Sequence, residues 1–248
     1  MNLLLLAPEE LTDGRATVMG RRARHMIDVL DVEPGATLRA GVVGGRVGTA
    51  SVIAVGDDLV EVNVELSGSA AQRPRVDLIL AIPRPKVLRR VLQTAASIGV
   101  GRIDLVNAWR VEKSYFQSPA LQDDALREQL WLGCEQGGTT WLPDIEVHAR
   151  LMSFVDSALD EPDDRVRALL HPHATAGIES AVEPGASGRV AAAIGPEGGW
   201  IDRELETFEH REFRTVSLGK SVLRVEAAVA GLLAQIQLLQ RLVARANT

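Results

Sequence analysis

The spacing of hydrophobic and polar residues changes after about residue 72. Before that point, short apolar stretches alternate with turn signals such as Pro34-Gly35 and Gly44-Gly45, a pattern typical of short β-strands. The leucine run at the start of the chain predicts a first strand. Residues 1–72 are therefore expected to form a small β-barrel or sandwich. Further strands are predicted at residues 37–40, 47–55 and 59–66, one short helix at 21–30, and a small, polar linker at 67–74.

From residue 73 onward, strand patterns alternate with helical patterns. Residues 76–82 form an apolar run typical of a buried strand, and Pro85 opens a helical pattern that continues to about Ile98. This alternation predicts a parallel α/β sheet over residues 73–248, with a ligand site at the carboxyl ends of its strands. The last helix, predicted from Val222 to about Ala244, is apolar over so wide an arc that we expect a homodimer. Further strands are predicted at residues 102–107, 166–170 and 190–194, and a further helix at 123–136.

The composition indicates a soluble, cytoplasmic protein. Cys134 is the only cysteine, so an intramolecular disulfide is excluded and a thiolate-rich metal site is disfavoured. The sequence contains no apolar run near the roughly 18 residues that a membrane span needs. The leucine run at the start lacks the basic residues that precede the core of a secretory signal.

Charge is distributed unevenly along the chain. The net charge is −6, which by itself argues against a nucleic-acid partner. Residues 73–116, however, carry nine basic and three acidic residues, whereas the segments on either side are acidic. Such a basic island is the pattern expected for local contact with phosphates, although arginines on different surfaces can also cluster in sequence. We expect Arg84, Lys86, Arg89 and Arg90 to contact RNA phosphates.

The string IGPEGGW at residues 194–200 joins a predicted strand directly to a glycine-rich turn. Its glycines allow a ligand to approach the backbone, whose amides can donate hydrogen bonds. Asp202 is expected to cap the helix that follows, and Glu204 and Glu206 in its first turn make it a poor phosphate site. An ordinary strand-to-helix turn has a similar composition, so this string alone is not specific.

Other binding motifs are excluded by their spacing. Gly219-Lys220-Ser221 resembles the end of a phosphate-binding Walker A loop, but Arg214 stands where that loop requires glycine. Residues 41–48 do not match the dinucleotide motif in any register. The histidines are not spaced as metal ligands, and a turn explains the near pair His171 and His173. We predict no metal site.

A second string, residues 216–228, contains a Ser-Leu-Gly turn that leads into the last helix. Arg224 falls in the expected first turn of that apolar helix, where it needs a partner. Arg224 and Glu226 are two residues apart and would not face each other on a helix. An ion pair with another helix remains the alternative explanation for Arg224.

Together the two strings resemble the RsmE-type 16S rRNA uracil-N3 methyltransferases of the SPOUT superfamily. Weaker matches extend over most of the chain: Pro85-Lys86 with Arg89-Arg90, Glu135-Gln136 followed by Gly138, and His25 with Pro34-Gly35. The resemblance implies a PUA-like RNA-binding domain at residues 1–72 and a trefoil-knotted methyltransferase domain at 73–248. It also implies a homodimer that acts on 16S rRNA or the small ribosomal subunit.

The resemblance further implies that S-adenosyl-L-methionine lies in the knot, held by three loops. The implied cofactor-binding residues are Leu170, His171, Ile194, Gly195, Glu197, Gly198, Gly199, Ser217, Leu218, Gly219, Val222 and Leu223. Arg22, Arg24 and Gln136 join the four basic-island residues as predicted RNA contacts. As catalytic residues we expect Arg224, which would stabilise a uracil anion, and Glu226, which would position Arg224 or accept the proton. Glu197 is expected either to brace its loop or to contact the base.

Several residues depart from the family pattern. The family usually has arginine at Ser221, threonine at Val225, arginine at Thr139 and glutamate at Ser97. These positions lie around the expected RNA side, whereas both cofactor loops match. Methylation of N3 of a conserved uridine is therefore the favoured function. The alternatives are methylation of another RNA nucleotide, or an RNA-binding or ribosome-assembly protein with little or no activity. An enzyme acting on a small molecule is disfavoured by the basic island.

Overall fold

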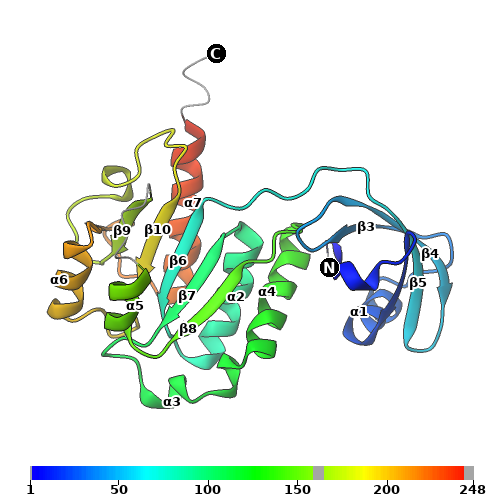
Figure 1. Ribbon diagram of the computed structural model, residues 1–248, viewed down its shortest axis with the longest axis horizontal. Helices are drawn as coiled ribbons and strands as arrows, with labels where there is room; N and C mark the ends of the chain where they lie inside the picture. Colours follow the sequence, from blue (N-terminus) through cyan, green and yellow to red (C-terminus); the bar gives the residue numbers. More distant parts are fainter. Residues whose placement is uncertain (1, 159–164, 243–248) are drawn as a thin grey trace. The chain divides into compact units, whose positions relative to one another are not determined.

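The computed structural model describes residues 2–158 and 165–242, which divide into two units. The first unit contains the residues up to Arg73 together with Trp131–Leu142. The second contains Pro74–Leu130 and the described residues from Pro143 onward. Figure 1 shows the elements of each unit, coloured along the chain. Among the described residues, no helix is both long enough and apolar enough to cross a membrane.

The first unit is built on a five-stranded sheet with the strand order β1-β3-β4-β5-β2. Figure 1 labels β3, β4 and β5 of this sheet. β1 pairs in parallel with β3, and the other pairs are antiparallel. Side chains alternate between exposed and buried along β2 and most of β5, because one face of the sheet covers the core. The strands are β1 (Leu4–Leu6), β2 (Arg15–Met19), β3 (Thr37–Val42), β4 (Val47–Val55) and β5 (Leu59–Glu65), and the helices are η1 (Pro8–Glu10), α1 (Gly20–Arg24) and the π-helical η2 (His25–Val29).

The segment Trp131–Leu142 belongs to the first unit although it is distant in sequence. The Asn2 backbone N–H donates to the carbonyl of Glu135 (3.1 Å), and the Gly44 N–H donates to the carbonyl of Thr140 (2.8 Å). The carboxylate of Glu135, which is buried, accepts a hydrogen bond from Arg21 at 2.8 Å. The first unit is therefore completed by a segment that no pattern in the sequence assigns to it.

The second unit contains a parallel six-stranded sheet with the order β11-β9-β10-β6-β7-β8. Every residue of β6 and β10 is buried, as expected for central strands of a sheet covered on both faces. The strands are β6 (Val76–Ala81), β7 (Arg102–Val106), β8 (Asp144–His148), β9 (Val166–Leu170), β10 (Val190–Ile194) and β11 (Arg214–Val216).

Helices α2 and α7 pack against each other, as do α5 and α6 (Figure 1). The amide of Gln237 in α7 donates to the carbonyl of Ile98 at the end of α2 (2.8 Å). The helices are α2 (Pro85–Ile98), α3 (Lys113–Phe116), η3 (Pro119–Leu121), α4 (Asp123–Gly137), α5 (Leu151–Ala158), η4 (Ile178–Ser180), α6 (Asp202–His210) and α7 (Val225–Leu242).

The structure confirms the predicted fold class, a parallel α/β sheet that follows a β-rich N-terminal region. β4, α2, β9 and β10 have the predicted bounds. The sequence pattern does not indicate β2 or β8. Both are edge strands of their sheets, where few side chains are fully buried and the apolar signal is weak.

Two predicted helix starts are wrong. The last helix begins at Val225 rather than Val222, because the carbonyl of Arg224 accepts the N–H of Ala228 (2.8 Å) and so opens the first helical turn. Its predicted end at residue 244 lies outside the described residues. Asp202 is the first residue of α6 and not its cap. The chain enters that helix through Ile201, whose N–H donates to the carboxylate of Glu204 (3.0 Å).

Candidate active site

A pocket of about 740 Å³ lies in the second unit, at the carboxyl ends of the central strands. The strands are parallel, so their carboxyl ends meet at one edge of the sheet and the loops that follow can share a site. Segments 170–173 and 194–200 and most of 218–228 line the pocket, which Arg84 and Arg110 complete. Every predicted cofactor residue except Ser217 is in this lining.

The glycine-rich loop after β10 forms a tight turn against Trp200. The Gly199 N–H donates to the carbonyl of Pro196 (2.8 Å), and Gly199 has a φ of +74°, which favours glycine. A Cβ atom at Gly195 would lie 3.1 Å from the indole of Trp200, closer than ordinary contact. Trp200 is buried and packs edge-on against Phe208. Gly195 is thus required by its close packing against Trp200, which also lines the pocket.

Glu197 holds this loop near the N-terminus of α2. Its carboxylate accepts the backbone N–H of Arg84, the residue before the helix, at 3.2 Å. A carboxylate is stabilised there, because the amides at a helix N-terminus carry partial positive charge. A hydrogen bond with Tyr115 and the charge of Glu197 raise the pKa of Arg84. This geometry supports a bracing role for Glu197.

Arg110 and Glu204 support the same loop, and neither was predicted as a site residue. The Arg110 guanidinium donates to the carbonyl of Gly198 at 2.6 Å. Glu204 is buried in α6 and accepts the N–H of Trp109 at 2.8 Å, in addition to that of Ile201. The acid in the first turn of α6 is therefore directed back to backbone amides. Glutamate at the third helical position often accepts the N-cap N–H, although Ile201 lacks the hydroxyl that completes the capping-box signature.

The second loop, after β11, lines the same pocket as the glycine turn. Ser217 does not line this pocket, because its N–H donates to the carbonyl of Ala176 (2.8 Å) and extends the strand pairing. Leu218 and Gly219 do line it, as do Val222 and Leu223. Val222 and Leu223 are 73% and 43% exposed, so they offer an apolar wall to a ligand or partner.

Arg224 and Glu226 both line the pocket, as their predicted catalytic roles require. Arg224 is exposed at the entry to α7, and Glu226 lies in the first turn of that helix. Arg224 precedes the helix, so the helical geometry that would keep its side chain away from Glu226 does not apply to this pair. Arg224 and Glu226 thus add a cation and a carboxylate to a pocket that Arg84, Arg110 and Glu197 also line.

The predicted RNA-binding residues are found in different settings. Arg84 lines the pocket, whereas Lys86, Arg89 and Arg90 are exposed on α2. In the first unit, Arg22 is engaged with the carboxylate of Glu10 and donates to the carbonyl of Leu5. Arg24 pairs with Asp58 at 3.0 Å, and Gln136 is exposed with its backbone carbonyl bound to Asn2. The α2 cations are therefore freer to meet phosphates than Arg22.

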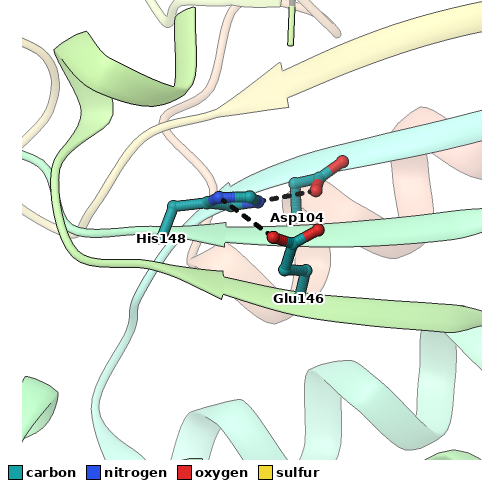
Figure 2. A group of neighbouring side chains, drawn as sticks. All are labelled: Asp104, Glu146 and His148. Carbon is teal, nitrogen blue, oxygen red and sulfur yellow. Dashed lines mark hydrogen bonds and ion pairs between the residues drawn. The ribbon is translucent and has the colours of Figure 1, made fainter. Parts of the chain in front are cut away.

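Asp104, Glu146 and His148 lie close together on β7 and β8 (Figure 2). His148 Nε2 is 2.8 Å from the carboxylate of Asp104. Burial raises the pKa of Asp104, but hydrogen bonds from His148 and Arg102 outweigh it, so the pKa lies below its ordinary value. Arg102 donates to both oxygens of Asp104 and also to Glu146. Because a guanidinium occupies the carboxylates, we interpret this cluster as an ion-pair network.

Comparison with known proteins identifies the family. The model of the RNA methyltransferase domain matches residues 71–237. Ribosomal RNA small subunit methyltransferase E of Treponema pallidum is 31% identical over 232 residues, covering 92% of this chain and 87% of that protein. Ribosomal RNA small subunit methyltransferase E 1 of Borreliella burgdorferi is 22% identical and covers 92% and 94%.

A solved structure has the same fold. The crystal structure of a ribosomal RNA small subunit methyltransferase E from Neisseria gonorrhoeae, bound to S-adenosyl methionine, has a TM-score of 0.78 and 22% identity. The match covers 96% of this chain and 97% of that one. The predicted resemblance is thus confirmed over nearly the whole length. This chain belongs to the RNA methyltransferase family, among the relatives of ribosomal RNA small subunit methyltransferase E.

Proposed function

We propose that this protein uses S-adenosyl-L-methionine to methylate N3 of a uridine in 16S ribosomal RNA. The observation that carries the proposal is the pocket at the carboxyl ends of β9, β10 and β11, formed by the two loops that match the family. Its volume of about 740 Å³ lies in the range of small-molecule and cofactor sites. The curated relatives act on small-subunit ribosomal RNA, as their names state, which supports RNA as the substrate.

The residues in the pocket fit the proposed cofactor. Leu170, Ile194 and Leu218 supply apolar surface for an adenine ring. Gly219 lines the pocket and has no heavy atom within 4 Å of the place where a Cβ would lie, so the backbone there is open to a ligand. The loops also bring backbone amides and carbonyls to the pocket, groups that can hydrogen-bond the polar parts of the cofactor. These apolar side chains and backbone groups are therefore suited to a nucleoside with a neutral or zwitterionic tail.

When bound, the cofactor supplies an electrophilic methyl group. The chain must then align the uracil ring and stabilise the charge that develops as the N3 proton leaves. We assign the charge-stabilising role to Arg224, which is exposed in the pocket lining and can approach the uracil oxygens. Glu226 is assigned to accept the N3 proton or to position Arg224. Glu197 is assigned to hold the cofactor loop through the Arg84 amide.

RNA binding is assigned to exposed cations on α2 and at the pocket. Lys86, Arg89 and Arg90 project from the helix that begins beside the pocket, and Arg84 lines the pocket itself. Phosphate contacts of this kind carry little sequence information and mainly set position on the RNA. We assign the first unit, which contains the predicted domain 1–72 and adds the segment Trp131–Leu142, to RNA binding as a PUA-like domain.

A symmetric homodimer in the cytoplasm completes the proposal. Leu238 and Leu242 are 50% and 48% exposed on α7, and Val222 and Leu223 are exposed just before it. An apolar surface along one helix and its entry suits a twofold interface. We further propose that the second unit is tied in the trefoil knot that the family resemblance implies.

The test is mass spectrometry of ribosomal RNA nucleosides from a strain that lacks the gene. We expect 3-methyluridine to be lost and to return with the wild-type gene but not with Arg224→Ala. Loss of another methylated nucleoside, with 3-methyluridine retained, would refute the target while keeping the chemistry. An unchanged set of methylated nucleosides would instead favour a binding or assembly role, as the Ser221, Val225 and Thr139 departures allow.

A further inference from the structure

Trp109 is an exposed aromatic side chain next to the pocket. Its side chain is 79% exposed, in the loop that follows β7 at the same edge of the sheet as the pocket. Trp109 and Arg110 occupy the two central positions of a turn closed by the Val111 N–H and the Ala108 carbonyl (3.1 Å). Ala108 and Val111 are both buried. The turn is therefore anchored at its ends and holds the indole toward solvent.

The turn is also attached to the glycine-rich loop of the pocket. The Trp109 N–H donates to buried Glu204 (2.8 Å), the residue that also receives the Ile201 N–H. The neighbouring Arg110 donates to the carbonyl of Gly198 (2.6 Å), which lines the pocket. These bonds fix the backbone of Trp109 beside the loop that would hold the cofactor. The turn that carries the exposed indole is thus held at both its backbone and its neighbouring side chain.

The surroundings of Trp109 favour single-stranded RNA as its partner. Arg84 and Arg110 line the pocket, and Lys113 is exposed four residues after the tryptophan. Aromatic rings beside cations are the usual binding surface for unpaired nucleotides, whose bases stack on the ring. N3 of uracil lies on the base-pairing edge, so the target nucleotide must be unpaired when it reacts. Bases next to it then lose stacking partners, which an exposed indole can replace.

We propose that Trp109 is a substrate-binding residue that stacks against an RNA base flanking the target nucleotide. The inference rests on the proposed RNA methyltransferase function and extends it to a residue outside both matched loops. Because the indole acts on the RNA and not on the cofactor, its removal should weaken RNA binding alone. A phenylalanine at this position keeps an aromatic face and should retain most of the interaction.

The test compares wild type, Trp109→Ala and Trp109→Phe, with Glu209→Ala as a control that removes an exposed side chain on α6. Methyl transfer is measured over a range of concentrations of small ribosomal subunits taken from a strain lacking the gene. Binding of S-adenosyl-L-methionine is measured by calorimetry, and mass by light scattering. We expect Trp109→Ala to raise KM for subunits about tenfold, equivalent to about 1.4 kcal/mol. The kcat and the cofactor Kd should stay within about twofold, and Trp109→Phe should lie near wild type.

Each other outcome has a distinct meaning. An unchanged KM for subunits in Trp109→Ala overturns the inference. A fall to monomer mass in that variant also overturns it, because a second copy of the chain then covers the indole. If wild type binds the cofactor but transfers no methyl group, the proposed function fails. In that case filter binding of the same subunits to wild type and Trp109→Ala still decides the inference, and equal affinities overturn it.

Discussion

Replacing Gly195 with alanine tests whether its close packing against Trp200 fixes the position of the proposed cofactor loop. The added Cβ would lie 3.1 Å from Cε2 and Nε1 of Trp200 and 3.2 Å from Cδ1, whereas ordinary contacts begin near 3.4 Å. The indole cannot move away easily. It is 4% exposed and packs against Phe208 at 5.2 Å between ring centres, and Phe208 in turn packs against Phe213 at 4.9 Å. The glycine loop is therefore expected to shift away from the indole.

The expected magnitude follows from overpacking. Inserting a methyl group into a tightly packed site costs about 1–3 kcal/mol. For a chain of this size each kcal/mol lowers Tm by about 2–4 °C, so a decrease of about 2–12 °C is expected. A displaced loop should also raise the Kd of the cofactor at least about tenfold, which corresponds to about 1.4 kcal/mol of binding free energy. The measurements are thermal unfolding and calorimetry with S-adenosyl-L-methionine.

Gly231→Ala is the matched control. Its Cβ would lie 3.4 Å from Leu218, an ordinary contact, and Gly231 lies within α7. Alanine is favoured over glycine inside a helix by about 0.5–1 kcal/mol, so this variant should be more stable and bind cofactor normally. Trp200→Leu combined with Gly195→Ala should recover part of the lost affinity, relative to the sum of the single changes. Wild-type affinity in Gly195→Ala, or strict additivity in the double variant, would refute the reasoning.

Three other predictions follow from side chains near the sheet. Arg110→Ala should weaken cofactor binding about threefold to tenfold, through lost hydrogen bonds to the glycine loop; calorimetry should show no such loss for exposed Lys113→Ala. Asp104→Asn should lower the free energy of unfolding by about 1–3 kcal/mol at neutral pH. Because the folded-state pKa of Asp104 lies below its ordinary value, this difference should shrink as pH falls below about 4 in urea titrations, and a constant difference would contradict the assignment. Burial raises the pKa of Cys134 to about 12, so iodoacetamide at pH 8 should label it only after unfolding, as mass spectrometry can show.

The sequence alone was sufficient for most of the second unit's central elements. Apolar runs marked β9 and β10, and Pro85 marked the start of α2, because these signals depend on neighbouring residues and on complete burial. The two matched strings were also visible, since a turn that contains glycine directly after a strand is a local pattern. Their presence on two parallel strands was enough to predict one shared pocket.

Residues that act through contacts distant in sequence could not be predicted in the same way. Arg110 bonds to Gly198, 88 residues away, and Glu204 bonds to Trp109 across 95 residues. In the sequence, Arg110 is one arginine in a basic stretch and Glu204 is one acid in a helix. The loops after β7 and β10 meet because both strands pair in parallel with β6, one on each side, so that their carboxyl ends lie at the same edge of the sheet.

The tertiary structure also decided which predicted residues are available to a ligand. Ser217 lies in a matched loop, but its backbone extends the strand pairing and it leaves the pocket lining. Arg22 belongs to a basic run, yet Glu10 and the Leu5 carbonyl engage its guanidinium. Glu135 lies in a helix shared with the second unit but pairs with Arg21 in the first. The pattern of hydrophobic positions determines which segments become strands and helices, because burial acts on each segment separately. Hydrogen bonds and ion pairs join segments that meet only after folding, so the final set of site residues depends on the fold.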